Sequence, residues 1–211
     1  MSELIIREFV PSDTEALKRI LDESFIVDEF VTSTPPLDSV LEIYLRGKII
    51  ASTLALVVEK DEEVIGTIML RVNDRPRIRS PFDDVATILR RLLGLFIVDT
   101  SDAKLWKEYL RYEASYARLR HRTKVSLEHE ITLFMMAAAH RGQGIGSQLF
   151  AKAKEHMKEH GVRNFFLITD TDCTWQFYEA RGMDREVSDS FSMDLRRGQH
   201  DLTTYLYSGT L

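Results

Sequence analysis

The chain has 211 residues, of which 44% are hydrophobic and 29% are charged, so it can bury a full core, and we expect a single domain over residues 1–211. Its formal net charge of −5 at pH 7 argues against a general nucleic-acid-binding protein. Cys173 is the single cysteine, which excludes an intramolecular disulfide and a zinc site built from cysteines.

The N-terminal part predicts one strand and two helices. Residues 4–9 alternate between apolar and polar side chains, which indicates a strand. Residues 12–25 predict a helix in which Ser12 and Glu15 form a capping box. A proline-containing loop over residues 32–36 leads into a short helix with four side chains turned inward, namely Val40, Leu41, Tyr44 and Leu45.

A hairpin and a long helical insertion come next. Residues 53–60 and 64–72 flank an acidic turn over residues 61–63 and predict two antiparallel strands. Residues 74–129 then predict helices, because Pro81 suits the first turn of a helix. An apolar stripe follows it, formed by Val85, Ile88, Leu89, Leu92, Leu93 and Phe96.

The second helix of the insertion is rich in aromatic residues. Thr100 or Ser101 can cap it, and five of its side chains recur at helical spacing: Leu105, Tyr109, Tyr112, Tyr116 and Leu119. Trp106 is a further aromatic residue of the same helix. Together the two helices predict an αα-hairpin. The tyrosines can serve as packing between the two helices, as a lid or substrate wall, or as a subunit contact in a homodimer.

The C-terminal half alternates between strands and helices. Residues 130–138 predict a strand and residues 144–160 a helix that opens directly after a glycine-rich turn. Four further elements follow: a strand over 163–169, a helix over 174–181, a closing strand over 190–195 and another over 203–207.

The glycine-rich turn reads Arg141-Gly142-Gln143-Gly144-Ile145-Gly146. A helix N-terminus presents unpaired N–H groups and a partial positive charge, glycines allow a ligand close to the backbone, and Arg141 adds a cation. The turn therefore predicts a phosphate site. It is a near miss to the dinucleotide pattern G-x-G-x-x-G, but too little chain follows to complete that sheet, and the Walker pattern is absent.

Arg141, Gly144 and Gly146 satisfy R-x-x-G-x-G, which resembles the pyrophosphate-binding motif of the GNAT superfamily of acetyl-CoA-dependent N-acetyltransferases. Phe177-Tyr178 with Gly182 is similar to the F-Y-x-x-x-G signature of that family. The opening of the chain, Ile5-Ile6-Arg7 followed by Ser12-Asp13, is also similar. Two positions depart from the family pattern: Thr171 stands where many members carry asparagine, and Met183 replaces an aromatic residue.

The resemblance implies an α/β (α+β) fold with a mixed, mostly antiparallel central sheet flanked by helices, and places the inserted helices of residues 74–129 between the third and fourth strands. It implies acetyl-CoA as co-substrate. By the same resemblance the cofactor-binding residues are Met136, Ala137, Ala138, Arg141, Gly142, Gln143, Gly144, Ile145, Gly146 and Thr171.

The resemblance also implies the catalytic residues. Tyr178 falls where family members carry the tyrosine that protonates the departing thiolate, and a tyrosine is protonated at neutral pH. Glu130 falls where several members place a catalytic glutamate as base. The alternatives for the base are Glu128, His129, Asp170 and Asp172. Cys173 lacks a visible histidine partner, and we expect an inert thiol.

The expected function is transfer of an acetyl group from acetyl-CoA to a primary amine of a small molecule or peptide, directly within a ternary complex. The alternatives are a non-catalytic acetyl-CoA-binding regulatory module and an NAD-binding module. No nucleic acid, membrane or metal is expected. Because the N-terminus lacks the pattern of a signal peptide and no apolar run is long enough to span a bilayer, the sequence predicts a cytoplasmic protein.

Overall fold

The computed structural model describes residues 4–24, 34–78, 81–98, 103–195 and 198–211. Its strands are β1 (Leu4–Glu8), β2 (Leu54–Lys60), β3 (Glu63–Arg71), β4 (Glu130–Met136), β5 (Asn164–Asp170), β6 (Asp184–Leu195) and β7 (Gly198–Thr210). Its helices are α1 (Thr14–Ser24), α3 (Thr34–Ala51), α4 (Pro81–Val98), α5 (Ala103–Arg122), α6 (Ile145–Glu159) and α7 (Gln176–Glu179). Two 3₁₀ turns are η1 (Pro11–Asp13) and η2 (Ala138–His140).

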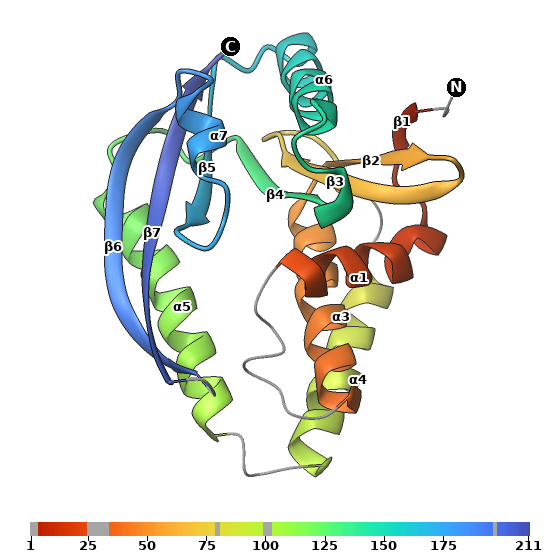
Figure 1. Ribbon diagram of the computed structural model, residues 1–211, viewed down its shortest axis with the longest axis vertical. Coiled ribbons are helices and arrows are strands. Elements are labelled where there is room, and N and C mark those ends of the chain that lie inside the picture. Colours follow the sequence, from red (N-terminus) through yellow and green to blue (C-terminus); the bar gives the residue numbers. More distant parts are fainter. Residues whose placement is uncertain (1–3, 25–33, 79–80, 99–102, 196–197) are drawn as a thin grey trace.

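A mixed sheet forms the centre of the described structure, with the strand order β1-β2-β3-β4-β5-β7-β6. Every neighbouring pair is antiparallel except β4 and β5, which are parallel. Helices cover both faces of its first half, with α6 above and α1 and α3 below (Figure 1). This confirms the predicted fold class.

The alternation of side chains along β2 explains the two layers. Leu56 and Val58 pack in the core that α6 covers, whereas Ala55 and Val57 pack in the core under α1 and α3. Successive side chains of a strand point to opposite faces, so a strand that is apolar at every position is covered on both sides. The turn to β3 is tight, because Asp61 and Glu62 adopt positive φ values of 52° and 66°.

The sheet opens between β4 and β5. Each strand has seven residues, yet they pair only at Glu130 with Phe166 and at Ile131 with Leu167. Beyond these pairs the two strands diverge toward their C-terminal ends. The opening lies at the centre of the sheet, with the turn into α6 at the end of β4.

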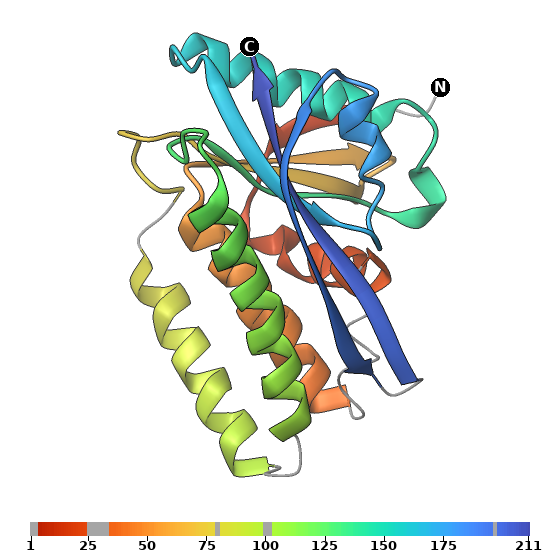
Figure 2. The ribbon, with the colours of Figure 1, turned by 90° about the vertical axis from the view of Figure 1, so that its left-hand side faces the viewer.

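The sequence predicted that the two inserted helices pack on each other, and this prediction is wrong. α4 lies along α3, while α5 lies along β6 and β7 (Figures 1 and 2). The α5 side chain Leu119 is buried with Phe166 and Leu206, and Ser115 shares a buried hydrogen bond of 2.6 Å with Thr204 of β7. Ion pairs add to this packing, because Arg118 of α5 contacts Asp189 of β6 at 2.6 Å.

α4 leaves several apolar side chains uncovered in the described structure. Phe82 is 81% exposed, Leu89 is 55% exposed and Leu93 is 63% exposed. These side chains recur along one face of the helix, as expected for a surface that another molecule can cover. The homodimer contact stays a prediction.

Three boundaries differ from the sequence predictions. Residues 34–36 belong to α3, because prolines are tolerated in the first turn of a helix. Ser12 and Glu15 do not form the capping box; instead Asp13 accepts the Val10 N–H at 2.8 Å and pairs with Arg7. The final two strands extend well beyond 190–195 and 203–207, since half-exposed polar residues continue both strands.

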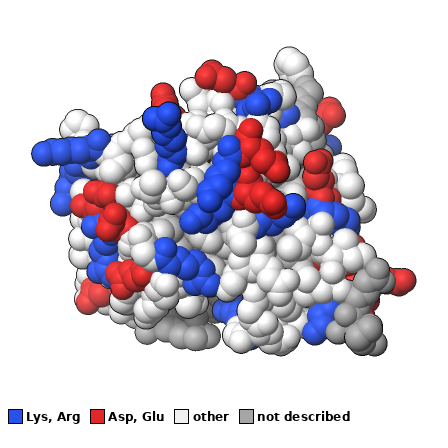
Figure 3. All heavy atoms as spheres, turned by 90° about the horizontal axis from the view of Figure 1, so that it is seen from above, with Lys and Arg blue, Asp and Glu red and all other residues white. Residues whose placement is uncertain are grey.

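Among the described residues, no helix has both the length and the apolar character needed to cross a bilayer. The face above α6 mixes basic and acidic side chains (Figure 3). The described part of this face therefore lacks the uniformly basic field that nucleic acid favours.

Candidate active site

The turn between β4 and α6 has the backbone geometry of an anion site. Gly142 and Gly144 adopt positive φ values of 75° and 77°, where side chains are disfavoured. A Cβ at either position would meet no atom within 4 Å. The space beside both glycines is therefore open to a ligand.

The amide groups of this turn are free to bind that ligand. The N–H groups of residues 142–146 find no acceptor among the described residues, whereas those of Ser147 and Gln148 donate to Gly144. The Arg141 N–H donates to the Ala138 carbonyl at 3.3 Å. A run of unpaired amides at a helix N-terminus suits a phosphate.

The side chains around the turn fix it to β4. The Arg141 guanidinium donates to the Met136 carbonyl at 3.0 Å and to Ser24 Oγ at 2.9 Å. A Cβ at Gly146 would lie 3.4 Å from the Phe134 ring, so the glycine allows α6 to start close against the strand. Arg141 thus anchors the end of β4 rather than reaching freely into the turn.

Tyr178 lies on α7, across the opening from the end of β4. It is 8% exposed, and the rings of Phe150, Phe177 and Tyr207 pack around it. Burial raises the pKa of its phenol above the ordinary value, so it is protonated at neutral pH. Its hydroxyl has no hydrogen-bond partner in the part of the chain that the structure describes and is available to a ligand.

A polar network ties α5 to the loop after β5. Tyr112 donates to Asp170 Oδ2 at 2.8 Å, and the Tyr112 and Tyr116 hydroxyls are 2.7 Å apart. The other Asp170 oxygen accepts the N–H groups of Asp172 and Cys173 at 3.0 and 3.1 Å. Burial raises the pKa of Asp170, because its charged form loses water contacts.

α3 meets the same network from the other side. Burial raises the pKa of Tyr44, and the negative charge of the Asp170 carboxylate raises it further, which places this tyrosine near the loop after β5. One turn later the Lys48 ammonium lies 5.1 Å from the centre of the Tyr44 ring. Burial lowers the pKa of Lys48, and no described residue forms an ion pair or a hydrogen bond with its ammonium.

Part of the chain matches the model of a known protein family. Residues 113–183 match the model of the Acetyltransferase (GNAT) family, a segment that contains the glycine-rich turn, β5 and Tyr178. The chain carries a GNAT acetyltransferase domain. It is accordingly an acyltransferase, and its co-substrate is acetyl-CoA.

Solved structures align with this acetyltransferase over nearly its whole length. They include a PaiA N-acetyltransferase from Thermoplasma acidophilum in complex with coenzyme A (TM-score 0.54, 15% identity, 99% of each chain). A putative phosphinothricin N-acetyltransferase gives a TM-score of 0.56 at 15% identity over 99% of each chain. The ribosomal-protein-alanine N-acetyltransferase from Brucella melitensis gives 0.51 at 17% identity over 98% of this chain and 99% of that one. At these identities the likeness shows the fold, and no curated protein matches the sequence.

The predicted cofactor residues of the acetyltransferase gather where β4 leaves the sheet, with Thr171 as an exception. Met136 is 8% exposed at the end of β4, with Ala137 and Ala138 directly after it. Thr171 lies across the opening, where its Oγ1 accepts the Thr203 N–H at 3.2 Å and its own N–H donates to Thr203. Thr171 therefore holds the loop to β7, and its contact with the cofactor stays a prediction.

Glu130 of the acetyltransferase lies at the start of β4, where the strands still pair. It is 7% exposed, and its two carboxylate oxygens contact Arg71 at 2.8 Å and Arg120 at 2.9 Å. Its catalytic role stays a prediction, and its position at the closed end of the opening gives it a structural role as well.

The sequence analysis named four further groups, one as an inert thiol and three as alternative bases. Burial raises the pKa of the Cys173 thiol, which keeps it protonated and supports an inert cysteine. His129 accepts the Asn73 N–H through Nδ1 at 3.2 Å. Asp172 pairs with His200 at 2.8 Å and Glu128 is exposed. Of these three, Asp172 alone contacts the network around Asp170 among the described residues, through its backbone N–H at 3.0 Å from Asp170 Oδ1 and not through its carboxylate.

Sequence reasoning missed Tyr44 and Lys48 as site residues. The sequence does contain a signal for them, because one helical face carries Leu41, Tyr44, Leu45 and Lys48. A lysine on a face that is otherwise apolar is unusual. The tyrosines of α5 were noticed, but their hydrogen bonds to Asp170 were not. The side chain of Trp106 lies outside the described residues.

Proposed function

We propose that this acetyltransferase transfers the acetyl group of acetyl-CoA directly to a primary amine of a small molecule or peptide within a ternary complex. The observation that supports this most is the run of unpaired amides over residues 142–146, beside strands that diverge. That geometry leaves room for the pyrophosphate at the start of α6 and for pantetheine along the end of β4.

In this proposal the amine nitrogen attacks the thioester carbonyl carbon, and the carbonyl oxygen becomes an oxyanion near the end of β4. The carbon–sulfur bond then breaks, and the electron pair leaves with the sulfur of coenzyme A. Tyr178 gives its phenolic proton to that thiolate. Its hydroxyl has no partner among the described side chains, so it can donate without breaking an existing hydrogen bond.

Two carboxylates are candidates for the base, Glu130 and Asp170. We propose Asp170, because its raised pKa makes it a better proton acceptor than an ordinary carboxylate. Its Oδ2 also accepts from Tyr112, whose hydroxyl lies 2.7 Å from that of Tyr116, so a proton taken from the amine can reach Asp170 through these two hydroxyl groups. Glu130 is the alternative, although two arginines already neutralise its charge.

We propose that the acceptor lies between α3 and α5, against Tyr44, Tyr112 and Tyr116. Lys48 supports an acceptor that carries an anionic group such as a carboxylate. An ammonium with a lowered pKa and no ionic partner among the described residues costs free energy, and an anion beside it would recover that cost. The acceptor would then present its amine toward Asp170 and its anion toward Lys48.

The test is release of free coenzyme A from acetyl-CoA with a panel of matched amines. Each pair contains an amino acid and the same amine without its carboxylate, and acetylated product is quantified by mass spectrometry. We expect turnover with amines and higher kcat/KM for the carboxylated member of each pair. Binding of acetyl-CoA without turnover of any amine would favour the non-catalytic module.

A thermal shift separates the NAD-binding alternative. A ligand at about 100 times its dissociation constant stabilises a protein by about 2.7 kcal/mol, which for a chain of this size raises Tm by roughly 5–11 °C. We expect this shift with acetyl-CoA and none with NAD. The reverse result would contradict the acetyl-CoA assignment.

A further inference from the structure

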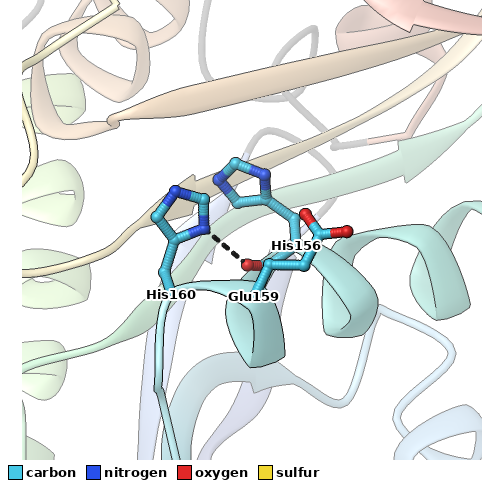
Figure 4. Close-up of side chains that lie close together, drawn as sticks. All are labelled: His156, Glu159 and His160. Atoms are coloured by element: carbon cyan, nitrogen blue, oxygen red, sulfur yellow. Dashed lines mark hydrogen bonds between the residues drawn. The ribbon is translucent and has the colours of Figure 1, made fainter.

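Three potential metal ligands meet at the C-terminal end of α6, at the opposite end of the helix from the glycine-rich turn. They are His156, Glu159 and His160, and one ligand atom of each lies within 4.8 Å of the others (Figure 4). Positions three and four apart share one face of a helix. The two imidazole rings are 4.2 Å apart between centroids.

The backbone fixes the tautomer of one histidine. His160 Nδ1 lies 2.8 Å from the His156 carbonyl oxygen (Figure 4). A carbonyl oxygen can only accept, so Nδ1 carries the proton and Nε2 keeps its lone pair. A histidine that binds a metal commonly donates its other ring N–H in this way.

The helix end that carries these residues is well anchored. Met157 is fully buried, and its carbonyl accepts the N–H groups of His160 and Val162 at 3.1 and 3.0 Å. Gly161 closes the turn with a φ of 73° and an N–H bond to Lys158 at 2.9 Å. Ligands on a rigid element hold their geometry better than ligands on a loop.

We propose that His156, Glu159 and His160 bind one divalent transition metal ion of the zinc class. Two imidazole nitrogens and one carboxylate oxygen suit zinc, cobalt, nickel or copper, whereas calcium and magnesium favour oxygen ligands. In zinc sites with the spacing His-x-x-Glu-His on a helix, the two histidines bind the ion. Water completes the coordination, because Glu159 is exposed and both histidines are half-buried.

The site is independent of acetyl transfer. α6 has 15 residues, which at about 1.5 Å each separates the ion from the glycine-rich turn by roughly 20 Å. The ion would cross-link the last turn of α6 and protect it from fraying. It takes no part in the reaction proposed for the acetyl site.

The test is calorimetric titration of tag-free protein, dialysed against a chelator, with zinc, followed by the visible spectrum of the cobalt form. We expect one equivalent of zinc to bind and both His156→Gln and Glu159→Gln to weaken binding, the first at least tenfold. His121→Gln is the matched control, because His121 is an exposed histidine in the last turn of α5.

Each outcome decides the proposal. Tight binding that falls in His156→Gln and persists in His121→Gln supports it, and so does a metal-dependent rise in Tm that His156→Gln removes. Absence of zinc binding, or equal affinity in all variants, overturns it. Circular dichroism of the metal-free variants confirms that a loss of binding does not come from unfolding, and acetyl-CoA affinity should be unchanged throughout.

Discussion

Replacing Gly144 by alanine tests the phosphate site directly, and Gly161 supplies a matched control. Both glycines flank α6, with positive φ values of 77° and 73°. A Cβ at either one would meet no protein atom within 4 Å. The two substitutions therefore impose the same backbone strain, but only the one at Gly144 adds a methyl group beside the unpaired amides of residues 142–146.

The magnitudes follow from that geometry. A non-glycine residue in the left-handed region costs roughly 1–2 kcal/mol. In a chain of this length each kcal/mol lowers Tm by about 2–4 °C, so both variants should lose about 2–8 °C. The methyl group at Gly144 would also keep a phosphate oxygen from its amide donors. We expect at least about a tenfold loss of affinity, which corresponds to roughly 1.4 kcal/mol.

The assay is isothermal titration of each variant with acetyl-CoA below its unfolding temperature, with Tm measured in parallel. Gly144→Ala should bind at least tenfold more weakly than Gly161→Ala at similar Tm. If the two variants bind acetyl-CoA equally well, the amides at the start of α6 do not hold the pyrophosphate, and the assignment of the turn is refuted.

Five further substitutions test the other parts of the site and surface. Tyr178→Phe should lower kcat by about 10²–10⁴-fold with little change in acetyl-CoA affinity or Tm, since no described hydrogen bond is lost; full turnover would show another proton source. In the unsubstituted protein kcat should fall as the pH drops through the raised pKa of Asp170. Asp170→Asn should abolish that fall, whereas Glu130→Gln should keep it. The opposite result would make Glu130 the base. Lys48→Met should raise KM for carboxylated amines at least about tenfold and leave their carboxylate-free partners unchanged, and an equal effect on both would remove the anion site. Leu89→Glu should halve the mass measured by light scattering if α4, where Leu89 is 55% exposed, joins two copies, and an unchanged dimer would place the contact elsewhere.

Local sequence signals predicted the elements whose geometry depends on near neighbours. The acidic turn between β2 and β3, the start of α6 after Gly144 and the short helix with Tyr178 all lie where the sequence places them. Each depends on a few consecutive residues: a two-residue turn with positive φ, a glycine that caps a helix, or a helical repeat of apolar side chains. The family resemblance added the mixed sheet, the place of the inserted helices between the third and fourth strands, and the acetyl donor.

Contacts between residues distant in the chain needed the tertiary structure. Tyr112 and Asp170 are 58 residues apart, and Arg71 and Glu130 are 59 residues apart, so no local pattern could pair them. The same holds for α5, whose tyrosine face fits a partner helix as well as a sheet. Its periodicity predicted that one face is buried, but it did not specify which element covers that face. Only the long hairpin of β6 and β7, extended by polar residues that the sequence pattern did not assign to strands, decided that α5 packs on the sheet and brings Tyr112 to Asp170.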